Sequence, residues 1–193
     1  MAFVGLKYCV FAPIKTETPF TPIVYGTGVV LGRMIGANIT FNRNSEPLYA
    51  DDGLAESDNS ITGGTISLNL DDVEEEAQVT AFGLLKSGEP GSEVYSEVGD
   101  PAPYGGIGYV RVRRLRGVTS YVAYWLHKVQ LAVNTDNAST KGQNITWQTP
   151  TADGTILAAH PNADKKAYYR DRAVFDTEAG AYAWVDKKAG IGA

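Results

Sequence analysis

The sequence reads YVRVRRLRG over residues 109–117 and YVAYWLHKVQLAV over residues 121–133, and this stretch decides the fold. Both runs are rich in β-branched and aromatic residues, and the second contains neither proline nor glycine, which is typical of β-strands. Because only a short link around Gly117 separates the two runs, they predict one long β-hairpin.

The second run changes character along its length. From Trp125 onward apolar and polar residues alternate, as on a strand with one buried face. Before that point both faces are apolar, with Tyr121 and Trp125 on one face and Val122 and Tyr124 on the other. Such a strand must be covered on both faces, either by the rest of the chain or by a neighbouring subunit. On the second alternative, Tyr121, Tyr124 and Trp125 are candidates for a subunit interface.

Residues 65–70 alternate apolar and polar side chains, and they predict a strand that leads into the first of two helices. Asp71 or Asp72 is expected to cap this helix, and the glutamates that follow suit its first turn, where the helix dipole favours anions. Gly88 is expected to end the helix.

The last part of the chain predicts a strand over residues 168–175 and then a second helix, with Asp176 as its N-cap and Gly190 as its end. Lys187 and Lys188 suit the C-terminal end of that helix dipole. Residues 1–193 are therefore expected to form one mainly β domain of the α+β class. Its architecture would be a sandwich or partial barrel of about eight strands, with one helix after the central strand and one at the C-terminus.

Three segments are expected to project from this domain. Residues from about 1 to 28 are interpreted as an N-terminal arm or edge segment, because Pro19 and Pro22 cannot lie in a central strand. Long polar loops are expected over about residues 42–64 and 88–106, and loops of such length are usually functional or mobile.

Charge is strongly segregated along the chain, whose net charge is −5. Residues 1–45 carry +3, residues 46–100 carry −13 and residues 101–193 carry +5. This pattern fits either an ordinary solvated surface or self-association, in which the acidic region of one copy meets the basic region of the next.

Four arginines gather in the first strand of the hairpin. Alternation places Arg111 and Arg113 on one strand face and Arg114 and Arg116 on the other. Binding to nucleic-acid phosphates would favour a single face. All four are therefore interpreted as candidates for a subunit interface, where carboxylates of another copy would pair with them.

No group of residues has the spacing of a catalytic, metal or cofactor site. The carboxylates of residues 51–58 depart from the calcium-loop pattern, and the glycines of residues 26–36 lack the lysine of a phosphate loop. His127 is interpreted as a structural histidine, His160 lies in a turn, and Cys9 is interpreted as a small buried hydrophobe. We therefore expect no enzyme, no metal and no cofactor.

No membrane partner is expected either. No apolar run reaches the roughly 18 residues that a membrane-spanning helix needs. Residues 1–13 contain Lys7 and are not followed by the cleavage pattern of a signal peptide.

Several motifs occur in a distinctive order. The acidic segment begins LYADD at residues 48–52, the hairpin contains YWLHKVQL at 124–131, and TKGQNITWQTPT at 140–151 leads into DGTI at 153–156. In their order and spacing, over roughly the whole chain, these motifs resemble the major tail tube proteins of long, non-contractile-tailed bacteriophages.

The resemblance implies a structural subunit of the virion, made in the host cytoplasm, which forms hexameric rings that stack into the hollow tail tube. Further copies of the chain would be its main partners, together with tape-measure, tail-tip and tail-terminator proteins, and DNA would pass through without being tightly bound. Asp51 and Asp52 are then assigned to the wall of the lumen, and Glu56 and Asp58 to a subunit contact. The alternatives are a β-sandwich binding or decorating module of a virion and, less favoured, an enzyme of unknown chemistry.

Overall fold

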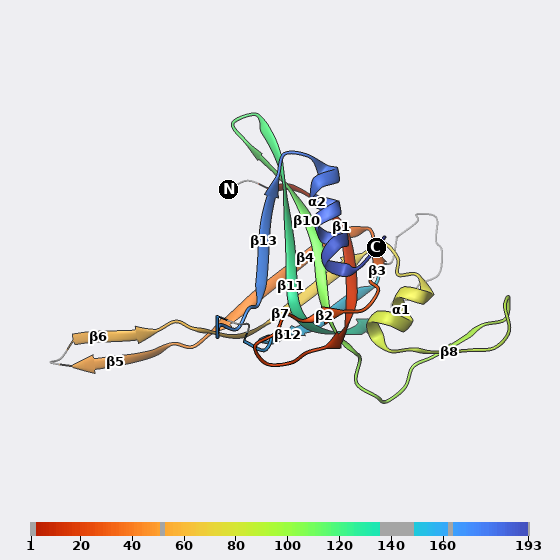
Figure 1. The fold of residues 1–193 in the computed structure, drawn as a ribbon, viewed down its shortest axis with the longest axis horizontal. Helices are drawn as coiled ribbons and strands as arrows, with labels where there is room; N and C mark the ends of the chain where they lie inside the picture. The colour runs from red at the N-terminus through yellow and green to blue at the C-terminus, as the bar shows by residue number, and fades with distance from the viewer. Residues whose placement is uncertain (1–2, 51–52, 136–148, 162–163, 193) are drawn as a thin grey trace, which may run out of the picture.

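The computed structural model describes residues 3–50, 53–135, 149–161 and 164–192, and it confirms a mainly β fold (Figure 1). Helices in this part of the chain are α1 (Glu75–Phe82) and α2 (Glu178–Ala189). The strands are β1 (Phe3–Thr16), β2 (Val24–Tyr25), β3 (Val29–Gly32), β4 (Met34–Arg43), β5 (Glu46–Ala50), β6 (Gly53–Asp58), β7 (Ile61–Leu70), β8 (Leu85–Ser87), β9 (Val94–Ser96), β10 (Tyr104–Leu115), β11 (Val118–Thr135), β12 (Thr151–Ile156) and β13 (Arg170–Phe175).

One antiparallel sheet holds nine of these strands. Its order is β2-β1-β10-β11-β12-β7-β4, with β13 beside β11 and β3 beside β1. Only Arg33 separates β3 from β4, yet β3 pairs with β1 whereas β4 pairs with β7. Strands β3 and β4 therefore connect the two sides of the sheet, which curls into a partial barrel. Of the two expected architectures, sandwich and partial barrel, the structure has the second.

The expected long hairpin is confirmed as β10 and β11. Their pairing runs from Tyr104 opposite Gln130 to Leu115 opposite Val118. Arg116 and Gly117 form the turn with φ values of 50° and 83°, and tight two-residue turns of this kind require positive φ at both positions.

The chain itself covers both faces of β11. On the inner face of the curled sheet, Tyr124 is 5% exposed and packs in the main core with Tyr109. On the outer face, Trp125 is fully buried against α2, where Val185 belongs to the same core cluster. Tyr124 and Trp125 are thus core residues of a single chain, which corrects their assignment to a subunit interface, whereas Tyr121 is only partly buried.

Glycines of β10 make room for Trp125. A Cβ atom on Gly106 would lie 2.4 Å from the indole ring of Trp125, and one on Gly108 would lie 2.5 Å from Val185. The indole nitrogen also donates a hydrogen bond of 3.2 Å to the hydroxyl of Tyr25. The missing side chains of β10 therefore allow α2 to pack closely on the sheet.

Helix α1 begins later and ends earlier than the sequence predicts. Glu74 precedes its first turn without a side-chain cap, and Gly83, in the left-handed conformation, ends it instead of Gly88. Asp71 is not a cap because its Oδ1 accepts hydrogen bonds from the backbone N–H groups of Arg33 and Asp72, both at 2.9 Å. Asp71 thus secures the interruption between β3 and β4.

Helix α2 agrees with the prediction except at its first residue. Thr177, not Asp176, is the N-cap, and its Oγ1 accepts a hydrogen bond of 3.2 Å from the N–H of Gly180. Gly190 ends the helix in the left-handed conformation, and Lys187 and Lys188 occupy the last turn, as predicted.

The projecting segments differ from the prediction in one respect. Residues 3–16 are not an arm, because β1 lies inside the sheet between β10 and its partners β2 and β3. Pro19 and Pro22 follow the end of β1, so they restrict only the segment after it. The loop of residues 42–64 contains the hairpin β5–β6, and a second hairpin, β8–β9, overlaps the loop of residues 88–106.

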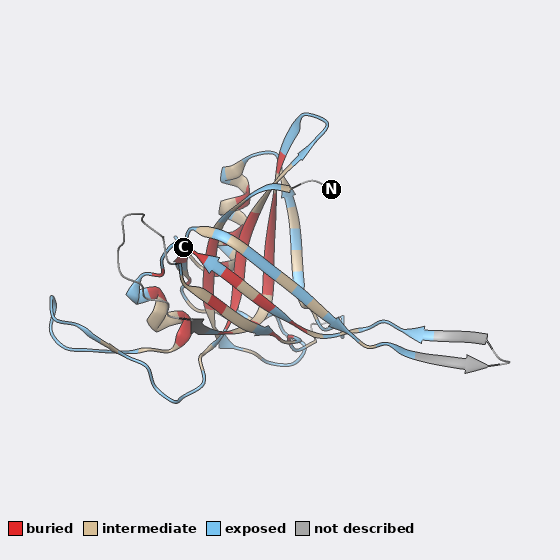
Figure 2. Ribbon diagram, turned by 180° about the vertical axis from the view of Figure 1, so that it is seen from behind, coloured by how far each residue is buried: buried red, intermediate tan, exposed pale blue. Residues whose placement is uncertain are grey.

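Figure 1 shows both small hairpins projecting from the lower part of the molecule, on opposite sides, whereas the turn between β10 and β11 lies at the other end. Figure 2 shows buried residues concentrated in the body, while the described parts of the two projections are mainly exposed. The projections therefore contribute little to the core of their own chain.

Candidate assembly surfaces

The arginines of β10 lie near the turn end of the long hairpin. Arg111 and Arg113 pair across the strands with Val122 and Ser120, so they share the inner face of the sheet, as predicted. Arg114 is exposed and belongs to the opposite face, whereas Arg116 occupies the turn itself.

The structure adds two arginines that sequence reasoning missed. Strand β13 pairs with β11 so that Arg172 lies opposite Tyr124 and Arg170 opposite Leu126, both of which belong to the inner core. Arg111, Arg113, Arg170 and Arg172 therefore lie on one face of three neighbouring strands, and we refer to these four residues as the arginine face. The alternation in RDRAVF of residues 170–175 is the only signal for the second pair, and it does not reveal which strand lies beside it.

Aromatic rings support the guanidinium groups. The Cζ of Arg111 lies 3.7 Å from the ring centre of Phe3, and that of Arg170 lies 4.9 Å from the ring centre of Phe41 and 5.2 Å from that of Tyr124. Arg113 Nε donates a hydrogen bond of 2.9 Å to Ser120 Oγ. Cation–π contacts of this kind hold the positive charge in place without neutralising it.

Burial raises the pKa of the Tyr109 phenol to about 12, although the nearby charges of Arg170 and Arg111 act in the opposite direction. The phenol therefore stays neutral near pH 7 and gives the arginine face no compensating negative charge. Within the described ranges, none of the four arginines forms an ion pair with a carboxylate, whereas Arg33, elsewhere on the surface, lies 3.8 Å from Asp71. The arginine face thus carries a charge of +4 that no carboxylate of the described residues pairs with.

Exposed apolar side chains continue this face toward the turn and the edge of the sheet. Leu115 is 54% exposed, Val118 68% and Val174 49%. Leu115 pairs with Val118, two residues beyond the pair of Arg113 and Ser120, so both pairs share one face. Val174 lies two residues after Arg172 on β13 and shares the same face. The surface is therefore mixed, with cationic and apolar groups side by side.

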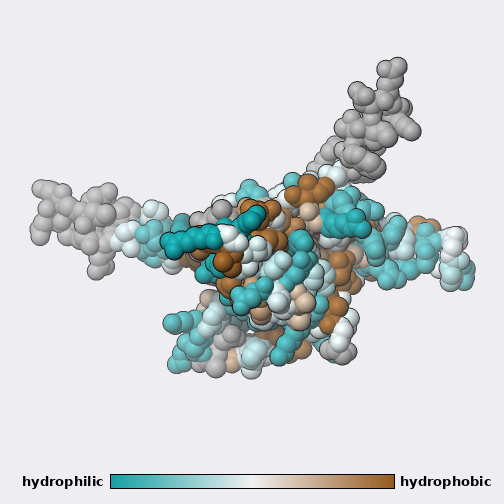
Figure 3. All heavy atoms as spheres, turned by 90° about the horizontal axis from the view of Figure 1, so that it is seen from above, coloured by the Kyte–Doolittle hydropathy of each residue, from teal (hydrophilic) through white to brown (hydrophobic). Residues whose placement is uncertain are grey.

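The β8–β9 arm, defined as residues 85–100, has the opposite charge. Lys86 Nζ lies 3.0 Å from Glu93, but Glu89, Glu97 and Asp100 are exposed and form no ion pair with any described residue. In Figure 3 this arm is the mainly hydrophilic projection on the right. Val94, which is 54% exposed, adds an apolar side chain to it.

The predicted acidic site residues are placed only in part. Asp51 and Asp52 lie outside the described residues, as does the side chain of Glu56, whose backbone belongs to β6. Asp58 is exposed at the base of the β5–β6 hairpin, where a hydrogen bond from the N–H of Ser60 lowers the pKa of its carboxyl group. Asp58 therefore organises the local turn, and the assignments to a lumen and a subunit contact stay predictions.

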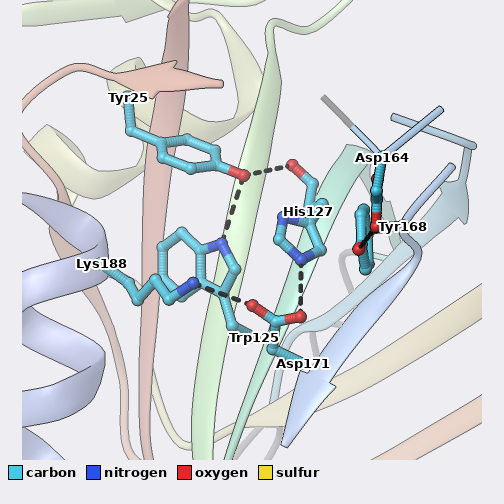
Figure 4. Close-up of polar contacts among 7 residues, drawn as sticks. All are labelled: Tyr25, Trp125, His127, Asp164, Tyr168, Asp171 and Lys188. Carbon is cyan, nitrogen blue, oxygen red and sulfur yellow. Dashed lines mark hydrogen bonds and ion pairs between the residues drawn. The ribbon is translucent and has the colours of Figure 1, made fainter. Parts of the chain in front are cut away.

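A separate polar cluster joins α2 to the sheet (Figure 4). Lys188 Nζ donates to Asp171 Oδ2 at 2.8 Å, and His127 Nε2 lies 3.0 Å from Asp171 Oδ1 without the geometry of an aligned hydrogen bond. Contact with His127, followed by that with Lys188, lowers the pKa of the Asp171 carboxyl group far below its usual range. Tyr25 completes the cluster by donating a hydrogen bond of 2.8 Å to the carbonyl of His127.

This cluster borders a pocket of about 400 Å³, in which His127 and Lys188 both contact Asp171. The described residues that line the pocket include no serine, threonine or cysteine that could act as a nucleophile beside His127. The arrangement agrees with the interpretation of His127 as a structural histidine.

Two further features concern only the part of the chain that the structure describes. No three of its His, Cys, Asp and Glu side chains come together in a way that could hold a metal ion. Neither α1 nor α2 is long and apolar enough to cross a membrane.

Comparison of the sequence with known protein families found no family that matches. Comparison with curated proteins likewise found no match. The resemblance to tail tube proteins therefore depends on the motif residues alone.

Proposed function

We propose that the chain is a structural subunit that assembles into stacked, hexameric rings and forms the hollow tail tube of a long, non-contractile-tailed bacteriophage. Further copies of the same chain are its main partners, and tape-measure, tail-tip and tail-terminator proteins complete the assembly. DNA passes through the tube without being tightly bound. The motifs of residues 48–52, 124–131, 140–151 and 153–156 support this proposal.

The structural observation that carries the proposal is the pair of small hairpins that leave the body. A two-stranded hairpin by itself is at best marginally stable in water. Hairpins β5–β6 and β8–β9 each pair only internally and form no part of the nine-stranded sheet. Such hairpins gain stability when they pack on another molecule, and further copies of the chain would provide that surface.

The alternative of a virion binding or decorating module would use exposed aromatic side chains to contact sugars. Trp125 is fully buried, and Trp184 packs against Phe175 and Lys188. Trp147 lies outside the described residues. The described tryptophans therefore give this alternative no exposed platform.

Electron microscopy of the purified protein tests the proposal. We expect rings or tubes with a central hole, formed either by the protein alone at high concentration or after seeding with the tail-tip complex of its own phage. Particles that stay monomeric under both conditions would contradict the proposal.

A further inference from the structure

We propose that the arginine face of one copy binds the β8–β9 arm of a second copy, and that this contact joins copies head to tail. The inference rests on the proposed function, because it names the contact by which successive rings would be held together. It assigns a partner to Arg170 and Arg172 as well as to Arg111 and Arg113.

The two surfaces carry opposite charges. The arginine face carries four guanidinium groups that pair with no carboxylate in the described ranges, and the arm carries three carboxylates, those of Glu89, Glu97 and Asp100, in the same condition. Complementary surfaces of this kind direct association and fix its register.

The two surfaces also lie in different parts of the molecule. The arm leaves the lower end of the molecule in Figure 1, whereas Arg111 and Arg113 lie toward the turn of the long hairpin at the other end. The arm and these two arginines therefore lie toward opposite ends of one chain, so a contact between them is a contact between copies. A contact between two different surfaces is heterologous, so it continues from copy to copy instead of closing as a dimer.

Both surfaces also expose apolar side chains. Leu115, Val118 and Val174 are about half exposed or more beside the arginines, and Val94 is 54% exposed on the arm. A protein segment with both carboxylates and apolar side chains matches such a mixed surface.

Nucleic acid fits the surface less well than the arm does. Binding to single strands uses exposed aromatic rings on which bases stack. The guanidinium groups of Arg111 and Arg170 already lie over Phe3 and Phe41, and Tyr124 is buried. The rings near the arginines are therefore occupied, and the exposed valines offer a phosphate backbone nothing to bind.

Two charge-reversal variants test the contact in the full-length chain. The first is Arg111→Glu with Arg172→Glu, and the second is Glu89→Lys with Glu97→Lys. Each should raise the protein concentration needed for assembly by about tenfold or more, because exposed pairs contribute modestly one by one and reversal adds repulsion. Sedimentation velocity at low and high salt measures this concentration.

The decisive sample is an equimolar mixture of the two variants. In each variant alone, the introduced side chains meet like charges on the opposing surface. In the mixture, the introduced glutamates of the first variant can meet the introduced lysines of the second, and the unchanged arm of the first can meet the unchanged arginine face of the second, so assembly should be regained. A matched control for the first variant is Lys15→Glu with Lys166→Glu, which makes the same change in net charge at exposed positions outside both surfaces and should assemble like the wild type.

Circular dichroism establishes that each variant is folded. Where the first double variant fails to fold, Arg172→Glu alone takes its place, because Arg172 is exposed. Wild-type assembly together with unchanged assembly of both variants would overturn this inference and leave the proposed function standing. Absence of wild-type assembly, both alone at high concentration and after seeding with the tail-tip complex, would overturn both.

A single-stranded DNA oligonucleotide provides the remaining comparison by fluorescence anisotropy. We expect the wild type and the first variant to bind it equally weakly. A loss of DNA affinity confined to the arginine variant, together with no recovery of assembly in the mixture, would show that the arginine face binds phosphate instead of the arm.

Discussion

Lys188 in the last turn of α2 lies 2.8 Å from Asp171 of β13, and this contact fastens the helix to the edge strand of the sheet. Asp171 also contacts His127 on β11, so three elements meet at one carboxylate. The packing of α2 on the outer face of the sheet therefore depends partly on the Asp171 carboxylate, in addition to the apolar contacts of Val185 and Trp125.

Asp171→Asn should lower the free energy of unfolding by about 1–2 kcal/mol at pH 7, a value for a charge-assisted hydrogen bond reduced for partial exposure. The folded-state pKa of Asp171 is depressed, so its contribution is present above the unfolded-state pKa of about 3.9 and declines as the pH falls toward the folded-state value. Urea unfolding at pH 7 and pH 3 measures the effect.

The difference between Asp171→Asn and the wild type should therefore shrink in acid. Asp176→Asn is the control because Asp176 is exposed at the end of β13. An equal difference at both pH values would show that the carboxylate contributes no charge-dependent stability.

Gly106→Ala should destabilise the fold by about 1–3 kcal/mol, the range for overpacking a well-filled core. The added methyl group would lie 2.4 Å from the Trp125 ring and 2.8 Å from that of Tyr25. Tryptophan fluorescence and thermal unfolding measure the change.

Gly99→Ala is the matched control for that substitution. A Cβ atom at position 99 has no neighbour within 4 Å, so this variant should unfold like the wild type. Similar stability of both variants would show that Gly106 is not required for the packing of Trp125.

The sequence predicted the long hairpin, the strand of residues 65–70 and the end of α2 because their signals are local. The alternation of apolar and polar residues defines a strand, and Gly117 and Gly190 mark a turn and a helix end, all within a few neighbouring residues. The sequence did not determine whether the chain itself or a second subunit packs on Trp125. A strand that is apolar on both faces shows that it is covered, but not by what. Asp71 or Asp72 was the predicted helix cap. The hydrogen bond that Asp71 accepts from the backbone of Arg33 could not be predicted, because it joins residues 38 positions apart.

The arginine face likewise could not be predicted in full from local sequence patterns. Arg111 and Arg113 were visible as part of a basic run, but Arg170 and Arg172 join them only through the pairing of β13 with β11. Register between strands that are distant in sequence depends on the whole sheet, so residue spacing could not bring the four side chains together.

Arg116→Asn should stabilise the chain by about 0.5–1 kcal/mol, because arginine is strained in the left-handed conformation and asparagine tolerates it. Arg116 has a φ of 50° in the turn between β10 and β11. Thermal unfolding measures the gain. Assembly should be unchanged, since Arg116 is not part of the arginine face; weaker assembly would mean that the turn itself contacts a neighbour.

Cys9 should resist thiol reagents in the folded protein. It is fully buried in β1, and this burial raises the pKa of its thiol to about 12, which leaves almost no reactive thiolate at pH 8. We expect labelling by a chromogenic disulfide reagent to be slow in buffer and rapid in denaturant. Because the chain has a single cysteine, rapid labelling without denaturant would show that β1 opens readily.

Replacing residues 86–97 by a short Gly-Ser linker should leave the fold intact but prevent assembly. Nearly all of this segment is exposed, and its strands pair only with each other, so its loss should change the free energy of unfolding by no more than about 0.5 kcal/mol. The same change removes Glu89 and Glu97, which we expect the arginine face of the next copy to bind.

Urea unfolding and electron microscopy of the same preparation separate these two effects. The folding control is Glu97→Gln in the intact arm, which removes one charge and should weaken assembly only slightly. A shortened protein that still forms tubes would show that the β8–β9 arm is dispensable for stacking, whereas a shortened protein that unfolds would show that the arm belongs to the folded body.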